Sequence, residues 1–292
     1  MITVEKLSKS IKDKPILSDI SFEIEAGECV ALIGPNGAGK TTLMSCLLGD
    51  VAYQKGTIRL FGLSPKDKAL RHQVAVLFQD NVVQKKMTVN ELITFQQAIY
   101  KDCLTRDEIE KFLQFSQKQY ADFAEKLSGG QKRLLQFVLA LVGKPKLLFL
   151  DEPTAGMDTS TRQYFWEMIE ELKSKGITII YSSHYIEEVE HTADRILVLN
   201  QGRLLRDTTP YAMKAEEKQK VFTVPSRFKS EVEKWKEISD LEVNRDNLIF
   251  VTREPDFVWK RLENSGCSIR DIEMSNRSLL DSIFMTTERE EK

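Results

Sequence analysis

Apolar and polar positions in the N-terminal part of the chain alternate or cluster as they do in strands. Residues 2–7 and 19–25 alternate apolar with polar side chains, which is the period of a half-buried strand. Nearly unbroken apolar runs are typical of strands that are buried on both faces of a parallel sheet. Such runs lie at 29–33, 74–78, 146–150 and 177–181. We therefore expect an α/β core built on a parallel sheet.

Between residue 81 and about residue 142 the apolar spacing changes to that of an α-helix. Apolar residues at helical spacing include Val89, Leu92, Ile93, Ile109, Phe112, Leu113, Leu134, Leu135, Val138 and Leu139. Because the strand pattern resumes after this segment, we interpret it as a helical subdomain inserted into the α/β core.

A second, smaller unit is expected from residue 214. The charged stretch 215–220 indicates a linker or a solvated helix. The pattern beyond it predicts β-α-β-β-α-β with a last helix, which is the split βαβ, ferredoxin-like order. The predicted strands are 221–224, 241–243, 248–252 and 268–273, and the last helix is 278–286. We expect a first domain at 1–213 and an α+β domain at 214–292 that docks or stabilises, because no intact catalytic motif lies in the second.

The composition of the chain disfavours nucleic-acid-binding, membrane-spanning and secreted proteins. The chain has 292 residues, 41% of them hydrophobic, and a net charge of −2, so no basic field points to nucleic acid. The most apolar stretch, 134–142, is too short to cross a bilayer, and residues 1–5 lack a secretion signal. The four cysteines form no C-x-x-C pair, so buried, reduced thiols are expected. These features indicate a cytoplasmic protein, at most peripheral to a membrane.

A phosphate-binding loop follows the predicted strand at 29–33. The segment reads Gly34-Pro35-Asn36-Gly37-Ala38-Gly39-Lys40-Thr41-Thr42 and matches G-x-x-x-x-G-K-T. The glycines let successive backbone N–H groups form an anion nest, and the next helix adds its positive end. Lys40 is expected to reach the β- and γ-phosphates, and the Thr41 hydroxyl to bind Mg²⁺. The strand–loop–helix context favours this interpretation over a chance match.

Polar side chains follow three of the predicted strands. Asp151 and Glu152 end one strand, Gln79 ends another, and His184 follows a third. Carboxyl ends of parallel strands gather at one edge of the sheet, where ligands bind. Asp151 can therefore bind Mg²⁺ through water, Glu152 can polarise an attacking water, and His184 can reach the γ-phosphate. The alternatives are two solvated acids and a structural histidine.

A second anion site is predicted in the helical subdomain. Leu127-Ser128-Gly129-Gly130-Gln131 offers a hydroxyl and two unhindered backbone N–H groups at the start of a helix. Because this site lies on a separate subdomain, it need not serve its own phosphate-binding loop. We therefore expect a partner subunit.

These motifs make the chain similar to the ATP-binding subunits of ABC transporters, over roughly residues 1–210. The corresponding segments are Walker A at 34–42, the glutamine loop at Gln79, the signature at 127–131, Walker B at 147–152, the D-loop at 155–158 and the switch His184. The resemblance implies a Mg²⁺-dependent ATPase with a separate membrane permease. It also implies two such domains, in a homodimer or with a related partner, that sandwich ATP between Walker A of one and the signature of the other.

The resemblance also implies residue roles. Glu152 would be the general base, Gln79 would sense Mg²⁺ and the attacking water, and Asp158 would couple the two sites. Ile11 occupies the position of the family's adenine-stacking aromatic residue. Isoleucine can cover the base by apolar contact but offers no π-face, so base selectivity is the property this departure affects.

The subtype is predicted from less specific segments. Residues 87–92 and 278–284 resemble those of bacterial exporters of drugs, bacteriocins and antimicrobial peptides, so peptides, drugs or lipids are the expected cargo. An importer ATPase and a soluble ABC protein acting on ribosomes are the alternatives, although ribosomal members normally carry two such domains per chain. DNA-repair relatives need long heptad arms, and P-loop kinases lack the signature.

The region 79–91 is expected to receive a short helix of the permease at the inner face of the membrane. Val82, Val83 and Met87 would line a groove for an amphipathic helix. The alternative is that these three residues pack inside the helical subdomain.

Overall fold

The computed structural model describes residues 1–79, 84–183, 185–216 and 219–276, without the side chains of 186, 187 and 214–216. The chain forms two compact units, Met1–Pro210 and Tyr211–Lys292. The boundary expected from the sequence lies at 213.

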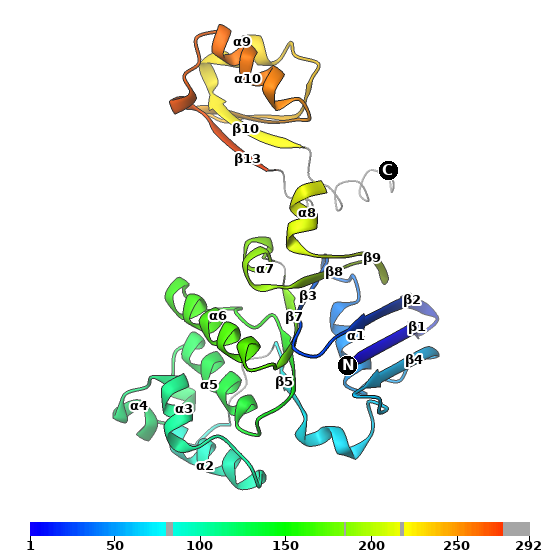
Figure 1. The fold of residues 1–292 in the computed structure, drawn as a ribbon. Helices are drawn as coiled ribbons and strands as arrows, with labels where there is room; N and C mark the ends of the chain where they lie inside the picture. Colours follow the sequence, from blue (N-terminus) through cyan, green and yellow to red (C-terminus); the bar gives the residue numbers. More distant parts are fainter. Residues whose placement is uncertain (80–83, 184, 217–218, 277–292) are drawn as a thin grey trace. The chain divides into compact units, whose positions relative to one another are not determined.

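A six-stranded sheet forms the centre of the first unit (Figure 1). Its strand order is β5-β6-β7-β3-β8-β9. All neighbours pair in parallel except the β8–β9 hairpin, which is antiparallel. The bounds are β3 (Cys29–Ile33), β5 (Val74–Leu77), β6 (Leu147–Asp151), β7 (Thr178–Ser183), β8 (Arg195–Asn200) and β9 (Arg203–Thr208). The expected parallel α/β core is therefore confirmed.

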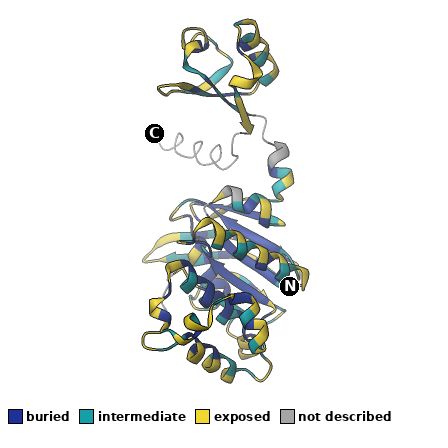
Figure 2. Ribbon diagram, turned by 90° about the vertical axis from the view of Figure 1, so that its left-hand side faces the viewer, coloured by how far each residue is buried: buried dark blue, intermediate teal, exposed yellow. Residues whose placement is uncertain are grey.

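The apolar runs of the sequence are the buried strands of this sheet. Every residue of β3, β6 and β7 is buried, and Figure 2 shows these strands in the interior of the unit. β8 is nearly as buried, whereas β9 at the edge is half-buried or exposed. The carboxyl ends of β3, β5, β6 and β7 consequently meet at one edge of the sheet, where the candidate site residues lie.

A second, three-stranded antiparallel sheet has the order β2-β1-β4. Its strands are β1 (Ile2–Ile11), β2 (Lys14–Ile24) and β4 (Lys55–Leu60), and a 3-10 turn η1 (Lys68–His72) follows. Helix α1 (Lys40–Leu47) packs between the two sheets (Figure 1). Apolar side chains of both sheets and of α1 form one core that includes Val4, Ile20, Val30, Leu32, Leu43, Leu47, Ile58 and Phe149.

The expected helical subdomain consists of short helices with strong N-terminal caps. Its elements are α2 (Val89–Ile99), α3 (Arg106–Leu113), α4 (Gln117–Ala121), the 3-10 turn η2 (Ala124–Lys126) and α5 (Gly129–Leu141). Capping boxes begin α2 at Thr88, α3 at Thr105 and α4 at Ser116. Each box satisfies two backbone N–H groups that would otherwise lack a partner, so the sequence fixes where these helices begin.

The subdomain packs on the core through α5 and α6 (Thr159–Ser174). Phe137 of α5 and Phe165 of α6 are buried, with ring centroids 4.6 Å apart. The helices α7 (Ile186–Thr192) and α8 (Pro210–Glu216) follow β7 and β9 along the chain. Part of the stretch read as a linker or solvated helix, residues 215 and 216, is the end of α8.

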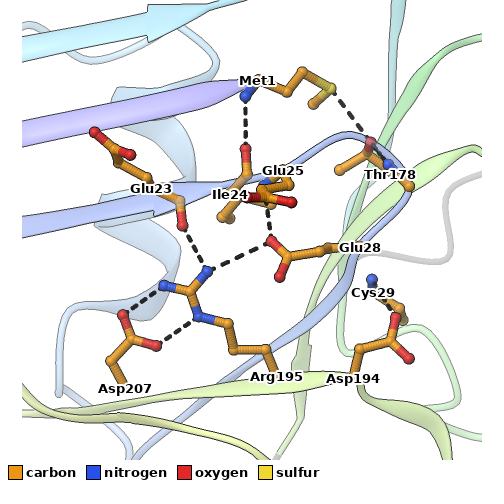
Figure 3. A network of polar contacts seen from close by, with 11 residues as sticks. Met1, Glu23, Ile24, Glu25, Glu28, Cys29, Thr178, Asp194, Arg195 and Asp207 are labelled. Atoms are coloured by element: carbon orange, nitrogen blue, oxygen red, sulfur yellow. Dashed lines mark hydrogen bonds and ion pairs between the residues drawn. The ribbon is translucent and has the colours of Figure 1, made fainter.

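A network of ion pairs lies where β3 and β8 begin and β2 ends (Figure 3). Arg195 donates to both carboxylate oxygens of Asp207, at 2.6 and 2.7 Å, and to the carbonyl of Glu23 at 2.7 Å. The same guanidinium lies 3.5 Å from a carboxylate oxygen of Glu28, which accepts the Glu25 N–H at 2.7 Å. The network therefore joins the three-stranded sheet to the amino-terminal edge of the main sheet.

The cysteines behave as small buried side chains. Burial raises the pKa of the Cys29 thiol to about 12, so the thiol stays protonated at neutral pH. All four cysteines are free; Cys29, Cys46 and Cys267 are buried and Cys103 is half-buried.

The second unit holds a four-stranded antiparallel sheet with the order β11-β12-β10-β13. Its elements are β10 (Lys220–Pro225), η3 (Ser226–Phe228), α9 (Lys229–Val232), β11 (Ile238–Val243), β12 (Asn247–Thr252), α10 (Pro255–Asn264), η4 (Ile269–Asp271) and β13 (Glu273–Asn276). Phe222, Phe250, Val258 and Leu262 are fully buried in its core.

One expected strand of this unit is wrong in position. Residues 269–271 form the 3-10 turn η4 instead of a strand, because the Ser268 hydroxyl accepts the N–H of Arg270 at 3.3 Å and caps the turn. The strand that pairs with β10 is β13, from residue 273. The helix expected at 278–286 lies outside the described residues.

Candidate active site

The loop from β3 to α1 is held by close backbone packing. Gly39 is the N-cap of α1 with φ of 103°, which is a left-handed conformation. A Cβ at this position would lie 2.8 Å from Leu17 Cδ2 and 3.1 Å from the carbonyl oxygen of Ile16. Only glycine fits there, so the loop stays fixed against β2. Asn36 and Gly37 at its tip are exposed, whereas Ala38 and Lys40 are buried.

Lys40 is the first residue of α1. Its Nζ donates to the carbonyl oxygens of Gly34 at 2.7 Å and Pro35 at 3.1 Å. Burial lowers the pKa of the Lys40 ammonium, and the neighbouring Glu152 and Asp151 carboxylates act in the opposite direction. The loop therefore holds a partly desolvated positive charge beside its backbone N–H groups.

Thr41 and Asp151 provide two hard oxygen donors at the same edge. The Thr41 hydroxyl lies 3.4 Å from Asp151 Oδ2, and the Ser182 hydroxyl donates to Asp151 Oδ1 at 2.5 Å. Asp151 ends β6 and Ser182 lies on the neighbouring β7, so the sheet itself sets this geometry. A hydroxyl and a carboxylate fit Mg²⁺, which takes few protein ligands and completes its shell with phosphate oxygens and water.

Glu152 leaves β6 in a strained conformation. Its φ is 44°, in the left-handed region that residues with a side chain seldom adopt. Its N–H donates to the Ser182 hydroxyl at 2.9 Å, and its carboxylate accepts from Gln79 Nε2 at 3.1 Å. The structure therefore brings together Gln79 and Glu152, which are separated by 73 residues in the chain.

Sequence reasoning missed Arg133, which is fully buried at 0% exposure in the second turn of α5. The Arg133 guanidinium donates to the carbonyl oxygens of Asp151 at 2.7 Å, Glu152 at 3.1 Å and Pro153 at 2.9 Å. Burial lowers the pKa of this guanidinium to about 10, against the charges of Asp151 and Glu152, so it stays charged at neutral pH. Arg133 lies two residues after the signature, where the sequence alone does not distinguish it from an ordinary polar position on a helix.

The same guanidinium also reaches the segment after β5. Arg133 Nη1 donates to the carbonyl oxygens of Phe78 and, at 3.4 Å, of Gln79. A single side chain of α5 therefore holds the backbone at the carboxyl ends of both β5 and β6, and each of these ends carries a candidate site residue.

The signature segment begins α5. Ser128 is the N-cap, and its hydroxyl accepts the Gln131 N–H at 3.2 Å while the Gln131 side chain accepts the Ser128 N–H at 3.1 Å. Ser128 and Gly129 are exposed, whereas Gly130 is buried. Gly130 faces the D-loop, because a Cβ built there would lie 3.8 Å from Asp158 Oδ2. The first turn of α5 therefore presents a hydroxyl and backbone N–H groups to solvent.

Asp158 is the N-cap of α6. Its carboxylate accepts from the Ser160 hydroxyl at 2.6 Å and from the Thr161 N–H at 3.0 Å and hydroxyl at 2.7 Å. These hydrogen bonds, led by that of Ser160, lower the pKa of the Asp158 carboxyl, so it is ionised at neutral pH.

The remaining candidate residues are placed less completely. Ile11 ends β1 opposite Lys14 and is 47% exposed, so its apolar surface is available at the edge of the three-stranded sheet. His184, Val82 and Val83 lie outside the described residues. Met87 is half-buried, and its carbonyl oxygen accepts the N–H of Ala124 at 2.9 Å.

Comparisons with known proteins agree with this fold and site. The family model described as ABC transporter matches residues 17–155. The chain is 36% identical over 222 residues to the Nod factor export ATP-binding protein I of Paraburkholderia xenovorans, covering 74% of this chain and 73% of the relative. It is 34% identical to a linearmycin resistance ATP-binding protein of Bacillus subtilis, covering 70% of this chain and 68% of the relative.

Solved structures share the fold of the first unit. The ATP-binding subunit of an ABC transporter aligns with a TM-score of 0.66 and 28% identity, covering 74% of this chain and 92% of that one. A dimeric, post-hydrolysis ATP-binding cassette bound to ADP and Pi aligns with a TM-score of 0.64 and 20% identity, covering 72% and 99%.

A phosphate-binding loop after β3, a carboxylate pair at the end of β6 and a capped signature helix define an ATP-hydrolysing cassette. The chain belongs to the ABC transporter family, as an ATP-binding subunit with ATPase activity. Among the described residues, no helix is both long and apolar enough to cross a membrane.

Proposed function

We propose that this chain is the motor of an exporter, works at the cytoplasmic face of the membrane and drives a separate permease. The observation that carries the proposal is that the phosphate-binding groups are divided between the main sheet and the helical subdomain. One part of the site lies at the carboxyl edge of the main sheet, where α1 begins with Lys40 and Thr41 after β3, β6 ends with Asp151 and Glu152, and Gln79 follows β5. The exposed N-terminus of α5 belongs to another subdomain and offers a second anion site.

The proposed reaction is the attack of water on the γ-phosphate of ATP. Lys40 and the loop 34–42 bind the phosphates. Thr41 and Asp151 would hold Mg²⁺, which would supply positive charge beside the phosphate oxygens. Glu152 accepts the proton of the attacking water as general base. Gln79, hydrogen-bonded to Glu152, orients that water, and His184 contacts the γ-phosphate.

Two copies, or this chain and a related one, are proposed to face each other head to tail. Each ATP then lies between loop 34–42 of one subunit and Ser128–Gln131 of the other. Ile11 covers the adenine, and Asp158, next to Gly130, couples the two sites. The dimeric cassette of the same fold supports this arrangement.

The γ-phosphate is the group that distinguishes the two states of such a pair. It contacts both subunits in the closed state, so its loss removes the bridge between them. A ligand shifts an equilibrium only by its differential affinity for the two states, so ATP closes the pair and release of phosphate opens it.

Export is supported by the relatives named for Nod factor export and linearmycin resistance. A groove of about 470 Å³ beside the glutamine loop, lined by residues that include Phe78, Gln96 and Leu139, is the proposed docking place for a short helix of the permease. Phe78, which lines this groove, is 60% exposed, and this suits contact with an apolar helix face.

For residues 214–292 we propose a ferredoxin-like domain that docks or stabilises. Its support is the all-antiparallel strand order β11-β12-β10-β13, with helices after its first and third strands in the chain. The ATPase domain is proposed to comprise residues 1–213.

The proposal is tested with Glu152→Gln. The variant keeps the size and the Gln79 contact of the side chain but cannot accept a proton, so turnover should fall by about 100- to 10,000-fold while ATP still binds. Gel filtration with Mg²⁺ and ATP should then show a stable dimer. Glu125→Gln, an exposed glutamate of η2, is the matched control and should behave as wild type.

Hydrolysis by Glu152→Gln at the wild-type rate would contradict the general base. A variant that binds ATP tightly but stays monomeric at every protein concentration, with the control unchanged, would contradict the paired site.

A further inference from the structure

The signature and Arg133 lie on one rigid element. Arg133 follows the Ser128 N-cap by five residues on α5, which is about 7.5 Å along a helix axis. The α5 helix begins with a complete capping box and has Leu134, Leu135 and Phe137 buried in the core. A displacement of its N-terminus therefore moves the Arg133 guanidinium with it.

The guanidinium ends on the backbone that carries the catalytic side chains. Three of its acceptors are the carbonyl oxygens of residues 151–153, and the other two are those of residues 78 and 79. Because the acceptor carbonyls include those of Gln79 and Glu152 themselves, a shift of the guanidinium changes the distance between these two side chains, now 3.1 Å apart.

Among the residues that the structure describes, none forms an ion pair with Arg133 that would explain the burial of its side chain. Every hydrogen bond described for Arg133 goes to a backbone carbonyl. The planar guanidinium has five N–H donors in a fixed fork, whereas the ammonium of lysine has three on one atom. Only arginine can therefore bridge two separate strand ends in this way.

We propose that Arg133 is a positioning residue that couples the two ATP sites of the pair. Engagement of the partner's nucleotide by the signature moves α5, and Arg133 passes this movement to Gln79 and Glu152 of its own subunit. The inference rests on the proposed paired function. It assigns the cooperativity between the sites to one side chain that contacts neither nucleotide.

The experiment compares Arg133→Gln with Arg195→Gln in the full chain. Arg195 also binds several groups, but at the amino-terminal edge of the sheet (Figure 3), so it controls for the loss of a multiply bonded arginine. ATPase rates are measured against ATP concentration, and binding is measured with a fluorescent ATP analogue. The wild type should have a Hill coefficient between one and two, because the pair has two sites.

Arg133→Gln should bind the analogue within about twofold of wild type, while kcat falls by about tenfold or more and the Hill coefficient falls to one. Arg195→Gln should keep the wild-type Hill coefficient. Arg133→Lys, which keeps the charge, carries the same test if the glutamine variant does not fold, and it should show a reduced Hill coefficient.

Wild-type cooperativity in a folded Arg133 variant would overturn this inference alone. Equal loss of cooperativity in Arg195→Gln would also overturn it, because the effect would then be one of general stability. A wild-type protein that hydrolyses ATP with a Hill coefficient of one and never forms a dimer as Glu152→Gln would overturn the proposed function, and this inference with it.

Discussion

At the amino-terminal edge of the main sheet the Arg195 side chain pairs with carboxylates, whereas at the carboxyl edge the side chains of Lys40 and Arg133 donate to backbone carbonyls. Arg195 donates to both oxygens of Asp207 (Figure 3). Lys40 donates to the carbonyls of Gly34 and Pro35, and Arg133 to five carbonyls. The positive charge of Arg195 is therefore neutralised by a carboxylate at the amino-terminal edge, whereas the positive charges of Lys40 and Arg133 are retained at the carboxyl edge.

The two kinds of partner suit different roles, which are stabilisation of the fold at the amino-terminal edge and binding of an anionic ligand at the carboxyl edge. An ion pair between exposed or half-exposed side chains stabilises the fold modestly and needs no ligand. A carbonyl carries only a partial charge, so a cation bound to carbonyls keeps most of its attraction for an anion. The carboxyl edge is therefore the edge that can still bind a triphosphate and Mg²⁺.

Lys40→Met tests this contrast with the largest expected effect. Loss of a charge-assisted hydrogen bond to phosphate should weaken ATP binding by about 10- to 100-fold, measured with a fluorescent analogue. Burial of the charged ammonium of Lys40 is unfavourable for folding, as its lowered pKa shows. Methionine removes this cost, so the melting temperature of the variant without nucleotide should not fall.

Lys66→Met, at an exposed lysine, is the control for this change. Unchanged nucleotide affinity in Lys40→Met would show that the retained charge is not used for phosphate.

Arg195→Gln should have the opposite profile. It removes a bidentate pair and a hydrogen bond to the Glu23 carbonyl, so the free energy of unfolding should fall by about 1–2 kcal/mol in urea titrations. The affinity for ATP should stay within about twofold of wild type, since the network lies at the far edge of the sheet. A large loss of affinity at equal stability would refute the division between the edges.

Glu152 allows a smaller and sharper test of strain at the carboxyl edge. Both Glu152→Ala and Glu152→Gly remove the carboxylate, but only glycine adopts φ of 44° without steric cost. Relief of this strain should make the glycine variant more stable than the alanine variant by about 1 kcal/mol. The larger backbone entropy that glycine loses on folding reduces this difference. Equal unfolding midpoints in urea would indicate that the left-handed conformation stores no usable strain.

Much of the first unit was predictable because its signals are local. The apolar runs became β3, β5, β6 and β7, and the glycine loop lies between β3 and α1 as predicted. Meeting of Gln79 with Glu152 follows from strand order alone, since β5 and β6 are neighbours and parallel. The roles of the site residues stay predictions until the variants are measured.

Other features depend on contacts between distant residues and left no local signal. Arg133 looks like an ordinary polar position on a helix until α5 is packed against the ends of β5 and β6. The φ of Glu152 is imposed by the sheet, where the Ser182 hydroxyl accepts its N–H. In the second unit, a strand was expected at 268–273, but Ser268 caps a turn and β13 starts at residue 273.

The acceptors of Arg133 have a consequence for how this protein can vary. Every amino acid supplies a carbonyl oxygen, so a mutation at Phe78 or at the side chain of residue 151 or 152 leaves the arginine's partners in the chain. The hydrogen bonds of Arg133 to the two strand ends therefore do not depend on which side chains these strand ends carry. Evolution could therefore exchange the catalytic side chains, or disable one of two unequal sites in a paired relative, while the proposed coupling through Arg133 is kept.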